Sequence, residues 1–411
     1  MPYRAKTISV LVLAVGALIG REACAAAITA LAGDSAEATS PPSDRGTSGQ
    51  MAPAVVPFEL YSGHIYIKVL INGKGPFNLG FDSGALNVLT PATAMQLGLV
   101  TAGKIEAHGT GGVQSATATR VDRVDVGTAT LRDQTFYVVQ FPPPAAEGRV
   151  LDGLIGFEWL SQFPTRIDYA KSTLTFFPRQ GFVYSGPAKA TPLQFRGRLP
   201  QIDGAVDGIS GRFSIDTGSN GSLTLYPAFV DKNALVSRLN AKTETMSAVG
   251  IGGPVYALMT RVGELNLAGH VVAKPVTFLS KARLGASSDA KTAGNIGSGI
   301  LRRFAITFDY PKAQAFFEPN ATFGEPDLAD RSGLRVNAAD NGFKIVFVVN
   351  GSTAMLAGLS PDDVIVAVNA QPATGLDLAT FRSQLKGPVG TKFSLVLESG
   401  KLATLVLKDI D

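Results

Sequence analysis

The feature that most constrains the fold is an internal repeat. Residues 154–178 align without a gap onto residues 295–319, a shift of 141 positions, and nine of the 25 aligned residues are identical. The same shift places HGTGG at residues 108–112 onto VGIGG at residues 249–253. Unrelated sequences of ordinary composition would share about one or two residues in such a window. The chain therefore contains two copies of one unit and is expected to fold as two similar halves.

Each copy also carries the triplet Asp-[Ser/Thr]-Gly at the end of an apolar run. The first is FDSGA at residues 81–85, and the second is IDTGS at residues 215–219. The two aspartates, Asp82 and Asp216, are 134 positions apart, so a seven-residue length difference falls between each triplet and the glycine-rich segment after it. Length differences belong in loops. One triplet is weak evidence because turns are rich in Asp, Thr and Gly, whereas two at equivalent places indicate a shared role.

Composition favours a mainly β fold. The chain has 411 residues, of which 45 are glycine and only 17% are charged. Short apolar or alternating runs are separated by Gly, Pro, Asn and Asp, which is typical of turn-rich β proteins. One short helix is predicted over residues 91–99. The formal net charge is only +4 and no run of Lys and Arg is present, which argues against a nucleic-acid partner.

The first 27 residues have the pattern of an export signal. Arg4 and Lys6 precede a thirteen-residue apolar core, and small residues follow it. This core is shorter than the roughly 20 residues that a membrane-spanning helix needs. We therefore expect a signal peptide over residues 1–27, a periplasmic or extracellular location, and no transmembrane segment in the mature chain. Residues 28–55 have the composition of a flexible linker, so the first lobe is expected to begin at residue 56.

Cysteine and histidine are too few for a disulfide framework or a metal site. Cys24 is the only cysteine and lies within the predicted signal. A lipid anchor on Cys24 is the alternative, although Arg21 and Glu22 stand where such a site has apolar and small residues. No metal-ligand spacing links the three histidines, which are His64, His108 and His270. We expect no cofactor and no bound metal.

Residues 323–411 do not repeat either half. SGLRV and an Asp-Asn-Gly hairpin signal at residues 340–342 precede the strand-like FKIVFVV, and NGSTAMLAGLSPDDVIVAVNAQP follows. This segment resembles a bacterial PDZ domain, an α+β fold, although Asp362 replaces the glycine usual at that place. The resemblance implies that an extended peptide or a protein C-terminus binds as an added strand. Its carboxylate would be held by the backbone amides of Gly333, Leu334, Arg335 and Val336. The alternative is a domain that only braces the second half.

The duplicated triplets resemble the signature strands of pepsin-like and retropepsin-like aspartic proteases. The resemblance covers both repeats and includes the later elements Leu154-Ile155-Gly156 and Asn295-Ile296-Gly297. Asn295 departs from the usual pair of apolar residues before this glycine. The family implies two β-barrel lobes, here residues 56–187 and 188–322, related by a pseudo-twofold axis.

Chemistry explains why two aspartates are needed. Hydrolysis of a peptide bond without a metal or a nucleophilic side chain needs one group to take a proton from water and another to protonate the carbonyl oxygen or the leaving nitrogen. In aspartic proteases two carboxyl groups about 3 Å apart share one proton and perform both tasks. We predict that Asp82 and Asp216 form this catalytic pair and titrate together.

The residues around the aspartates have implied supporting roles. Gly84 and Gly218 permit a sharp turn beside each carboxyl group. By the resemblance, Ser83 and Thr217 hydrogen-bond across the lobe interface and hold the two loops rigid.

Two glycine-rich segments stand where the family places flap hairpins, which open for substrate and close over it. The first flap contains His108, Gly109, Gly111 and Gly112, and the second contains Gly250, Gly252 and Gly253. Pepsin-like enzymes have a tyrosine on one flap. Here His108 is the nearest polar side chain.

The predicted protein is a secreted, monomeric aspartic endopeptidase of protein or peptide substrates with a C-terminal PDZ domain at residues 323–411. Three alternatives stay open. The aspartates can merely bond turn amides. The protein can be a catalytically silent peptide-binding or scaffold protein of the cell envelope. The active assembly can also require an intermolecular partner.

Overall fold

The computed structural model describes residues 52–410. The signal peptide predicted over residues 1–27, including Cys24, lies outside this range, as does the linker up to residue 51. The described residues are mainly β, as predicted. Regular structure starts at Ala54 with strand β1. Among residues 52–410, no helix is both long enough and apolar enough to cross a membrane.

The first half forms an eight-stranded sheet in the order β2-β3-β4-β9-β5-β8-β7-β6. Its strands are, in that order, Glu59–Tyr61, His64–Ile71, Lys74–Phe81, Gly153–Ile155, Val88–Leu89, Ala129–Val138, Gly112–Val126 and Ala102–Gly109. Its helices are α1 (Pro91–Leu97), α2 (Pro144–Glu147) and α3 (Phe157–Gln162). Helix α1 is the helix predicted over residues 91–99. It starts because the Thr90 hydroxyl accepts from the Thr93 amide, and it ends at Gly98, whose φ is 71°.

The second half forms a ten-stranded sheet in the order β17-β18-β21-β16-β22-β15-β14-β19-β20, with β13 paired to β14. In that order the strands are Thr243–Gly250, Gly253–Arg261, Val276–Ser280, Leu223–Leu225, Gly294–Ile296, Ile209–Ile215, Leu199–Val206, Glu264–Leu267 and His270–Ala273, with β13 at Gln194–Arg196. The short helices are α4 (Pro227–Lys232), α5 (Leu235–Arg238), η1 (Ala286–Ser288), α6 (Ser298–Leu301) and η2 (Tyr310–Lys312).

Seven strands follow the same order in both of these sheets. They are β3-β4-β9-β5-β8-β7-β6 in the first and β14-β15-β22-β16-β21-β18-β17 in the second. The strand before each aspartate pairs in parallel with the short strand that precedes the later glycine, so that Phe81 faces Ile155 and Ile215 faces Ile296. Strands from two distant segments are thus needed to place each aspartate.

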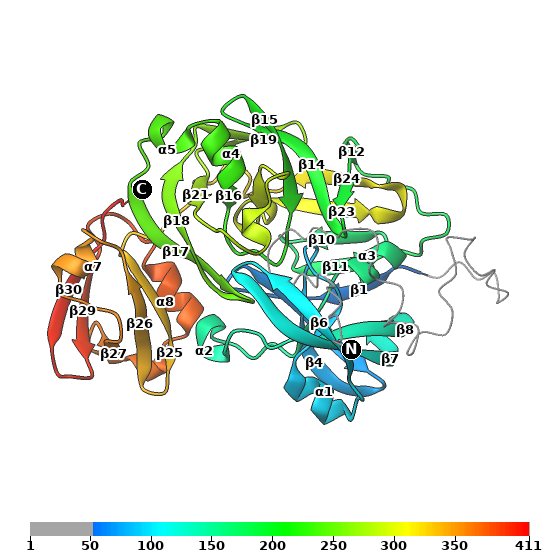
Figure 1. The fold of residues 1–411 in the computed structure, drawn as a ribbon, viewed down its shortest axis with the longest axis horizontal. Helices are drawn as coiled ribbons and strands as arrows, with labels where there is room; N and C mark the ends of the chain where they lie inside the picture. Colours follow the sequence, from blue (N-terminus) through cyan, green and yellow to red (C-terminus); the bar gives the residue numbers. More distant parts are fainter. Residues whose placement is uncertain (1–51, 411) are drawn as a thin grey trace, which may run out of the picture.

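A third sheet joins the halves, in the order β1-β11-β10-β23-β24-β12 (Figure 1). Its strands are Ala54–Pro57, Thr173–Phe176, Thr165–Asp168, Phe304–Asp309, Gln314–Pro319 and Thr191–Pro192. At its centre β10 and β23 run antiparallel, and Arg166 pairs with Thr307. These two residues occupy equivalent positions of the 141-residue repeat. One continuous apolar cluster includes the buried side chains of Trp159, Phe213 and Ile306. Because these residues come from both halves, the two halves share a core.

The C-terminal unit has its own core and its own sheet, in the order β25-β26-β27-β29-β30 with β28 paired to β27. Its strands are Leu334–Ala339, Gly342–Val348, Val364–Val368, Lys392–Leu397 and Leu402–Val406, with β28 at Gln371–Pro372. Its helices are α7 (Thr353–Leu356), η3 (Ala373–Gly375) and α8 (Leu378–Gln384). Phe343 and Phe381 stack at 4.6 Å between ring centroids and join β26 to α8. The turn residue Asp362 takes a positive φ of 73°, the conformation for which glycine is usual there.

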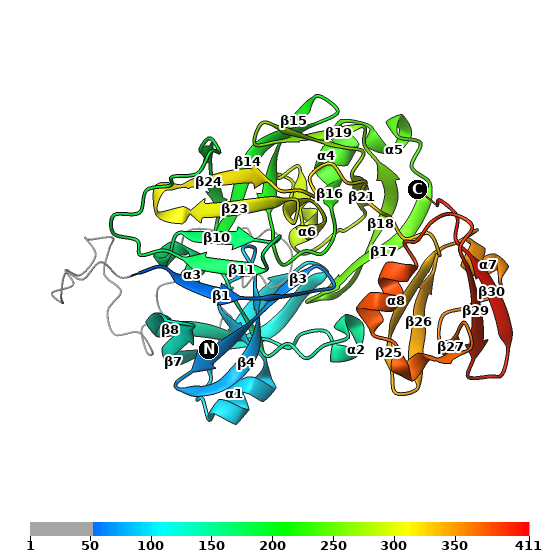
Figure 2. The same cartoon turned by 180° about the vertical axis from the view of Figure 1, so that it is seen from behind.

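This C-terminal unit lies against both halves, at one side of the molecule (Figure 1, Figure 2). It meets the second sheet where the rings of Tyr256 and Phe347 approach to 5.9 Å and where the Thr243 hydroxyl donates to the carbonyl oxygen of Ile410. It meets the first half at α2 and at Tyr61, whose hydroxyl donates to Asp377 Oδ2 at 2.8 Å.

Candidate active site

Asp82 and Asp216 each follow directly after the end of a buried strand. The Asp82 amide donates to the carbonyl oxygen of Ile155, and the Asp216 amide donates to that of Ile296, both at 3.0 Å. The side chains are almost completely buried, with 1% and 0% of each residue exposed. The parallel strand on one side of each aspartate therefore fixes its backbone.

The hydroxyls of Ser83 and Thr217 tie the two aspartate turns together. Ser83 Oγ accepts from the Thr217 amide at 3.0 Å and donates to the carbonyl oxygen of Ile215 at 2.8 Å. Thr217 Oγ1 accepts from the Ser83 amide at 2.9 Å and donates to the carbonyl oxygen of Phe81 at 3.1 Å. Each hydroxyl thus satisfies one amide and one carbonyl of the opposite turn. Four buried hydrogen bonds hold the two turns in one relative position.

Gly84 and Gly218 lie where any side chain would strike a carboxyl group. Their amides donate to their own aspartates, to Asp82 Oδ1 at 2.7 Å and to Asp216 Oδ1 at 2.9 Å. A Cβ on Gly84 would lie 2.8 Å from Asp216 Oδ1 and 3.2 Å from Asp82 Oδ1, and a Cβ on Gly218 would overlap Asp82 Oδ2. Oxygens from both aspartates therefore lie within 3.2 Å of a single point beside Gly84.

The two carboxyl groups interact electrostatically. Burial raises the pKa of Asp216 well above its ordinary value, and the charge of Asp82 and a hydrogen bond with that residue raise it further. The Gly218 amide and the Asn295 side chain act in the opposite direction and lower the pKa of Asp216. Two adjacent buried carboxyl groups cannot both ionise, so the pair holds one proton over a range of pH.

Asn295 makes the two sides of this pair unequal. Its Nδ2 donates to Asp216 Oδ2 at 3.1 Å, while its Oδ1 is buried and has no hydrogen-bond partner within residues 52–410. The equivalent position in the first half is Leu154, which has no polar group. The sequence showed Asn295 only as a departure from an apolar motif. A polar residue in an otherwise apolar strand was the signal that could have identified it.

The two glycine-rich segments form the tips of two hairpins that contact each other. The first is formed by β6 and β7 and the second by β17 and β18, and the Gly111 amide donates to the carbonyl oxygen of Ile251 at 3.0 Å. A Cβ on Gly111 would overlap the carbonyl oxygen of Gly253, and one on Gly252 would overlap the backbone of Gly112. Glycines are required because the two tips touch through their backbones.

The other residues predicted for the flaps lie in the same hairpins. Gly109 ends β6 beside Ile251, and Gly250 ends β17. His108 also lies in β6, where its Nε2 is 3.7 Å from Glu106 Oε2. At the tip itself the polar residue is the buried Thr110. The His108 side chain therefore lies beside Glu106 of its own strand, and it stands two positions before the buried tip residue.

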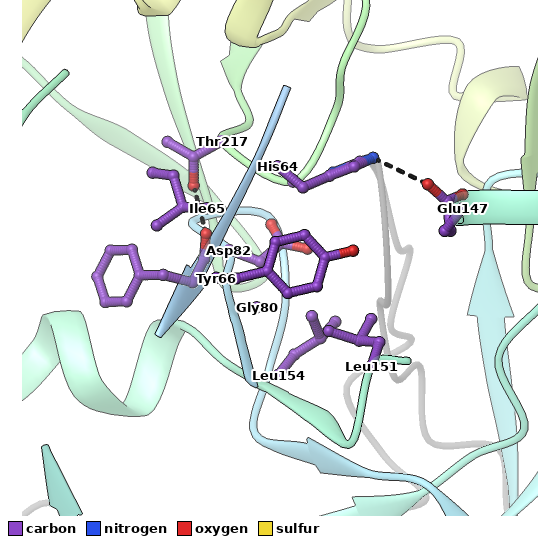
Figure 3. Close-up of a pocket in the computed structure, with 11 residues that line it drawn as sticks. His64, Ile65, Tyr66, Gly80, Asp82, Glu147, Leu151, Leu154 and Thr217 are labelled. Atoms are coloured by element: carbon purple, nitrogen blue, oxygen red, sulfur yellow. Dashed lines mark hydrogen bonds and ion pairs between the residues drawn. The ribbon is translucent and has the colours of Figure 1, made fainter. Parts of the chain in front are cut away.

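A small cavity adjoins Asp82 (Figure 3). Its volume is about 20 Å³, which is enough for one water molecule. Figure 3 shows that His64 points toward Glu147, and the two side chains form an ion pair with 3.5 Å between Nε2 and Oε2. The remaining lining residues include Tyr66, Leu151, Leu154, Thr217 and Gly218.

The histidine and glutamate at this cavity stabilise each other's charged form. Burial lowers the pKa of His64, but Glu147 and then the charge of Asp82 outweigh burial, so the pKa is raised overall. Burial raises the pKa of Glu147, yet His64 and the arginines Arg382 and Arg335 lower it to about 2. Neither His64 nor Glu147 was identified as a site residue from the sequence, because they are 83 positions apart and belong to no motif.

In the structure, most of the residues predicted to form the carboxylate-binding loop of the C-terminal unit do not lie in a loop. Leu334, Arg335 and Val336 lie in strand β25 rather than in a loop, and only Gly333, with a φ of 76°, precedes the strand. The Gly333 amide donates to Asp330 Oδ1 at 2.9 Å, and the Leu334 amide donates to the Ser332 hydroxyl at 2.9 Å. The chain's own side chains therefore occupy two amides that the prediction reserved for a ligand.

Within residues 52–410 no group of three or more His, Cys, Asp and Glu side chains could hold a metal ion.

Comparison with known proteins bears on the first half. A search of curated proteins found no match to the chain. Residues 67–159 match the family model described as aspartyl protease. This range includes Asp82, the first glycine-rich hairpin and the turn at Gly156. The match supports a retropepsin-like aspartyl protease domain and suggests a hydrolase of the aspartic protease type.

Proposed function

We propose that this protein is an aspartic endopeptidase in which Asp82 and Asp216 together activate water. One observation carries the proposal: Ser83 and Thr217 bond reciprocally across the two turns and bring both carboxyl groups to one point. The match of residues 67–159 to the aspartyl protease model supports the same reaction class.

In the proposed mechanism the ionised member of the pair takes a proton from a water molecule, which attacks the peptide carbonyl carbon. The protonated member donates to the carbonyl oxygen, and a tetrahedral intermediate forms. A proton then passes to the leaving nitrogen, the C–N bond breaks, and the pair returns to one shared proton. The contacting flap tips would exclude bulk water during these steps and must separate for an extended peptide to enter.

The arrangement of strands supports a two-lobed protease with a pseudo-twofold axis. Seven strands follow the same order in the two sheets, and Arg166 pairs with its own repeat equivalent, Thr307, as an axis through that pair would require. In this proposal residues 56–187 and 188–322 are the two lobes, and a monomer contains the complete site. We also propose that the C-terminal unit is a PDZ domain and that the protein is exported.

The test is proteolysis by purified full-length protein. Asp82→Asn and Asp216→Asn are each expected to lower cleavage of a denatured protein by about 10²- to 10⁴-fold between about pH 3 and pH 7. Asp203→Asn is the matched control, because Asp203 is an exposed aspartate of the second half that pairs with Arg212 on the surface. Equal cleavage by all three variants would refute the proposal. Stable peptide binding without any cleavage by the wild type would favour a catalytically silent binding protein.

A further inference from the structure

Helix α2 of the first half lies against the C-terminal unit. It packs on β25, the outer strand of that unit's sheet, and β25 also packs on α8 (Figure 1). Gly148, directly after α2, has a φ of 80°, and a Cβ there would lie 2.5 Å from the Tyr61 hydroxyl and 3.1 Å from Leu378 Cβ. The segment of residues 144–148 is therefore closely fitted to the C-terminal unit at this place.

Arg382 on α8 links this segment to the strand. Its Nη2 donates to the carbonyl oxygen of Ala146 at 2.8 Å and to that of Val336 at 2.7 Å, and its Nε donates to Val336 at 3.1 Å. One guanidinium group thus binds a backbone carbonyl of β25 and a backbone carbonyl of α2. A backbone contact of this kind does not depend on the side chain of Ala146, so another peptide could present the same carbonyl.

Charge complements these contacts. Glu147 is the one acidic residue of α2, and two arginines of the C-terminal unit, Arg382 and Arg335, lower the pKa of its carboxyl group. Arg335 Nε is buried and has no hydrogen-bond partner among the described residues. A buried guanidinium costs free energy unless an anion compensates it. The surface formed by β25 and α8 therefore favours a segment that carries a carboxylate.

The carboxylate that this surface accepts belongs to an acidic side chain and is not the C-terminus of a peptide. The backbone amides before β25 already donate within the chain, because Asp330 Oδ1 accepts from the amides of Ser332 and Gly333 and from the Ser332 hydroxyl. A terminal carboxylate would have to displace Asp330 from these donors. An acidic side chain at the position of Glu147 needs no such displacement.

We propose that the surface between β25 and α8 is a binding groove for an acidic peptide segment, and that this chain fills it with its own residues 144–148. The expected effect of peptide binding on the protease site rests on the proposed function, because Glu147 also pairs with His64 beside the cavity at Asp82. A competing peptide would remove Glu147 from His64, leave that histidine without its anion, and so change the protease site. Peptide binding at the C-terminal unit and the reactivity of the aspartate pair are thereby coupled.

Binding of a synthetic probe tests the groove directly. The probe is the chain's own sequence FPPPAAEGRV, residues 141–150, acetylated, amidated and fluorescently labelled, so that it carries no terminal carboxylate. Affinity is measured by anisotropy with full-length protein in an Asp82→Asn background, which excludes cleavage of the probe. Because the segment of residues 144–148 competes within the same molecule, Glu147→Ala is expected to bind the probe about tenfold more tightly than the parent. Glu147→Gln changes less volume and should shift affinity in the same direction.

Two controls define the site. Glu398→Gln removes an exposed glutamate elsewhere on the C-terminal unit, one that accepts from Asn341, and should leave affinity unchanged. Arg382→Ala in the Glu147→Gln background should lose most of the binding, as should a probe with Gln in place of its glutamate. Hydrogen exchange of residues 141–150 should rise when unlabelled probe is added.

Equal affinity of parent, Glu147→Ala and Glu147→Gln would overturn the proposal. So would binding without increased exchange in residues 141–150, or a failure of every variant to bind. Each readout is independent of proteolysis, so an inactive wild type would refute the proposed function and leave the groove to be judged by binding alone.

Discussion

Replacing Asn295 by leucine tests how the protein makes its two aspartates unequal. Leucine is the residue at the equivalent position of the first half, Leu154, so the variant copies a side chain that the repeat already accommodates. The change removes the donor that lies 3.1 Å from Asp216 Oδ2. That donor lowers the pKa of Asp216 by stabilising its ionised form, so its loss must raise the pKa.

The magnitude follows from the kind of bond that is lost. A hydrogen bond to a charged group contributes about 1.5–3 kcal/mol, and the lower end applies because 3.1 Å is long for such a bond. About 1.4 kcal/mol corresponds to a factor of about 10, so the alkaline limb of the pH profile, where Asp216 loses the proton that the pair shares, should move to higher pH, and kcat/KM there should rise about tenfold. The acid limb, where Asp82 ionises first, should change much less.

The assay is kcat/KM for a fluorogenic peptide as a function of pH. Gln201→Leu is the matched control, because Gln201 is a buried amide of the same half that donates to the hydroxyls of Ser214 and Thr292 rather than to an aspartate. It should lower stability without moving the alkaline limb. An alkaline limb that stays in place for Asn295→Leu, or moves equally for both variants, would refute the argument.

Three further outcomes are expected. Thr217→Val leaves buried partners unsatisfied and should lower the free energy of unfolding in urea by about 1–3 kcal/mol, together with activity. Gly111→Ala should impair closure of the flaps and lower kcat/KM about tenfold, whereas Gly324→Ala, with no atom within 4 Å of the new Cβ, should have no effect; equal activity of the two would contradict the flap contact. Glu147 has a pKa of about 2 against an ordinary 4.5, so it contributes stability above pH 4.5 that is lost as the pH falls toward 2. The pKa of His64 is raised above 6.5, so this residue contributes stability below pH 6.5 that is lost as the pH rises through the raised pKa. The melting temperature of Glu147→Gln should therefore depend less on pH at both ends, and a profile parallel to the wild type would show that this pair adds no stability.

Local pattern was sufficient for much of the protein. The repeat could be predicted by comparing the chain with itself, and the two Asp-[Ser/Thr]-Gly triplets and the glycine-rich hairpins because each depends on residues close together in the chain. The short helix after Thr90 could be predicted for the same reason, since its cap and its terminal glycine are local signals. Duplication also made the pairing of Asp82 with Asp216 predictable, because both copies of the repeat carry the same aspartate triplet.

The contacts of Glu147 could not be predicted in this way. Its carboxylate meets His64 from the first sheet and the charges of Arg335 and Arg382 from the C-terminal unit, and no sequence spacing connects these residues. Asp330 is a local case, three positions before Gly333, and it accepts from the Gly333 amide, one of those that the sequence assigned to a ligand.

By itself, the sequence determined the repeat, the aspartate-bearing turns and the mainly β character, because periodicity and turn chemistry act between near neighbours. Tertiary structure alone decided that Asn295 donates to only one aspartate and that α2 lies against β25. The first contact joins neighbouring strands of one sheet through residues that are 79 positions apart, and the second joins the first half to the C-terminal unit. Both are set by the packing of segments that are distant along the chain.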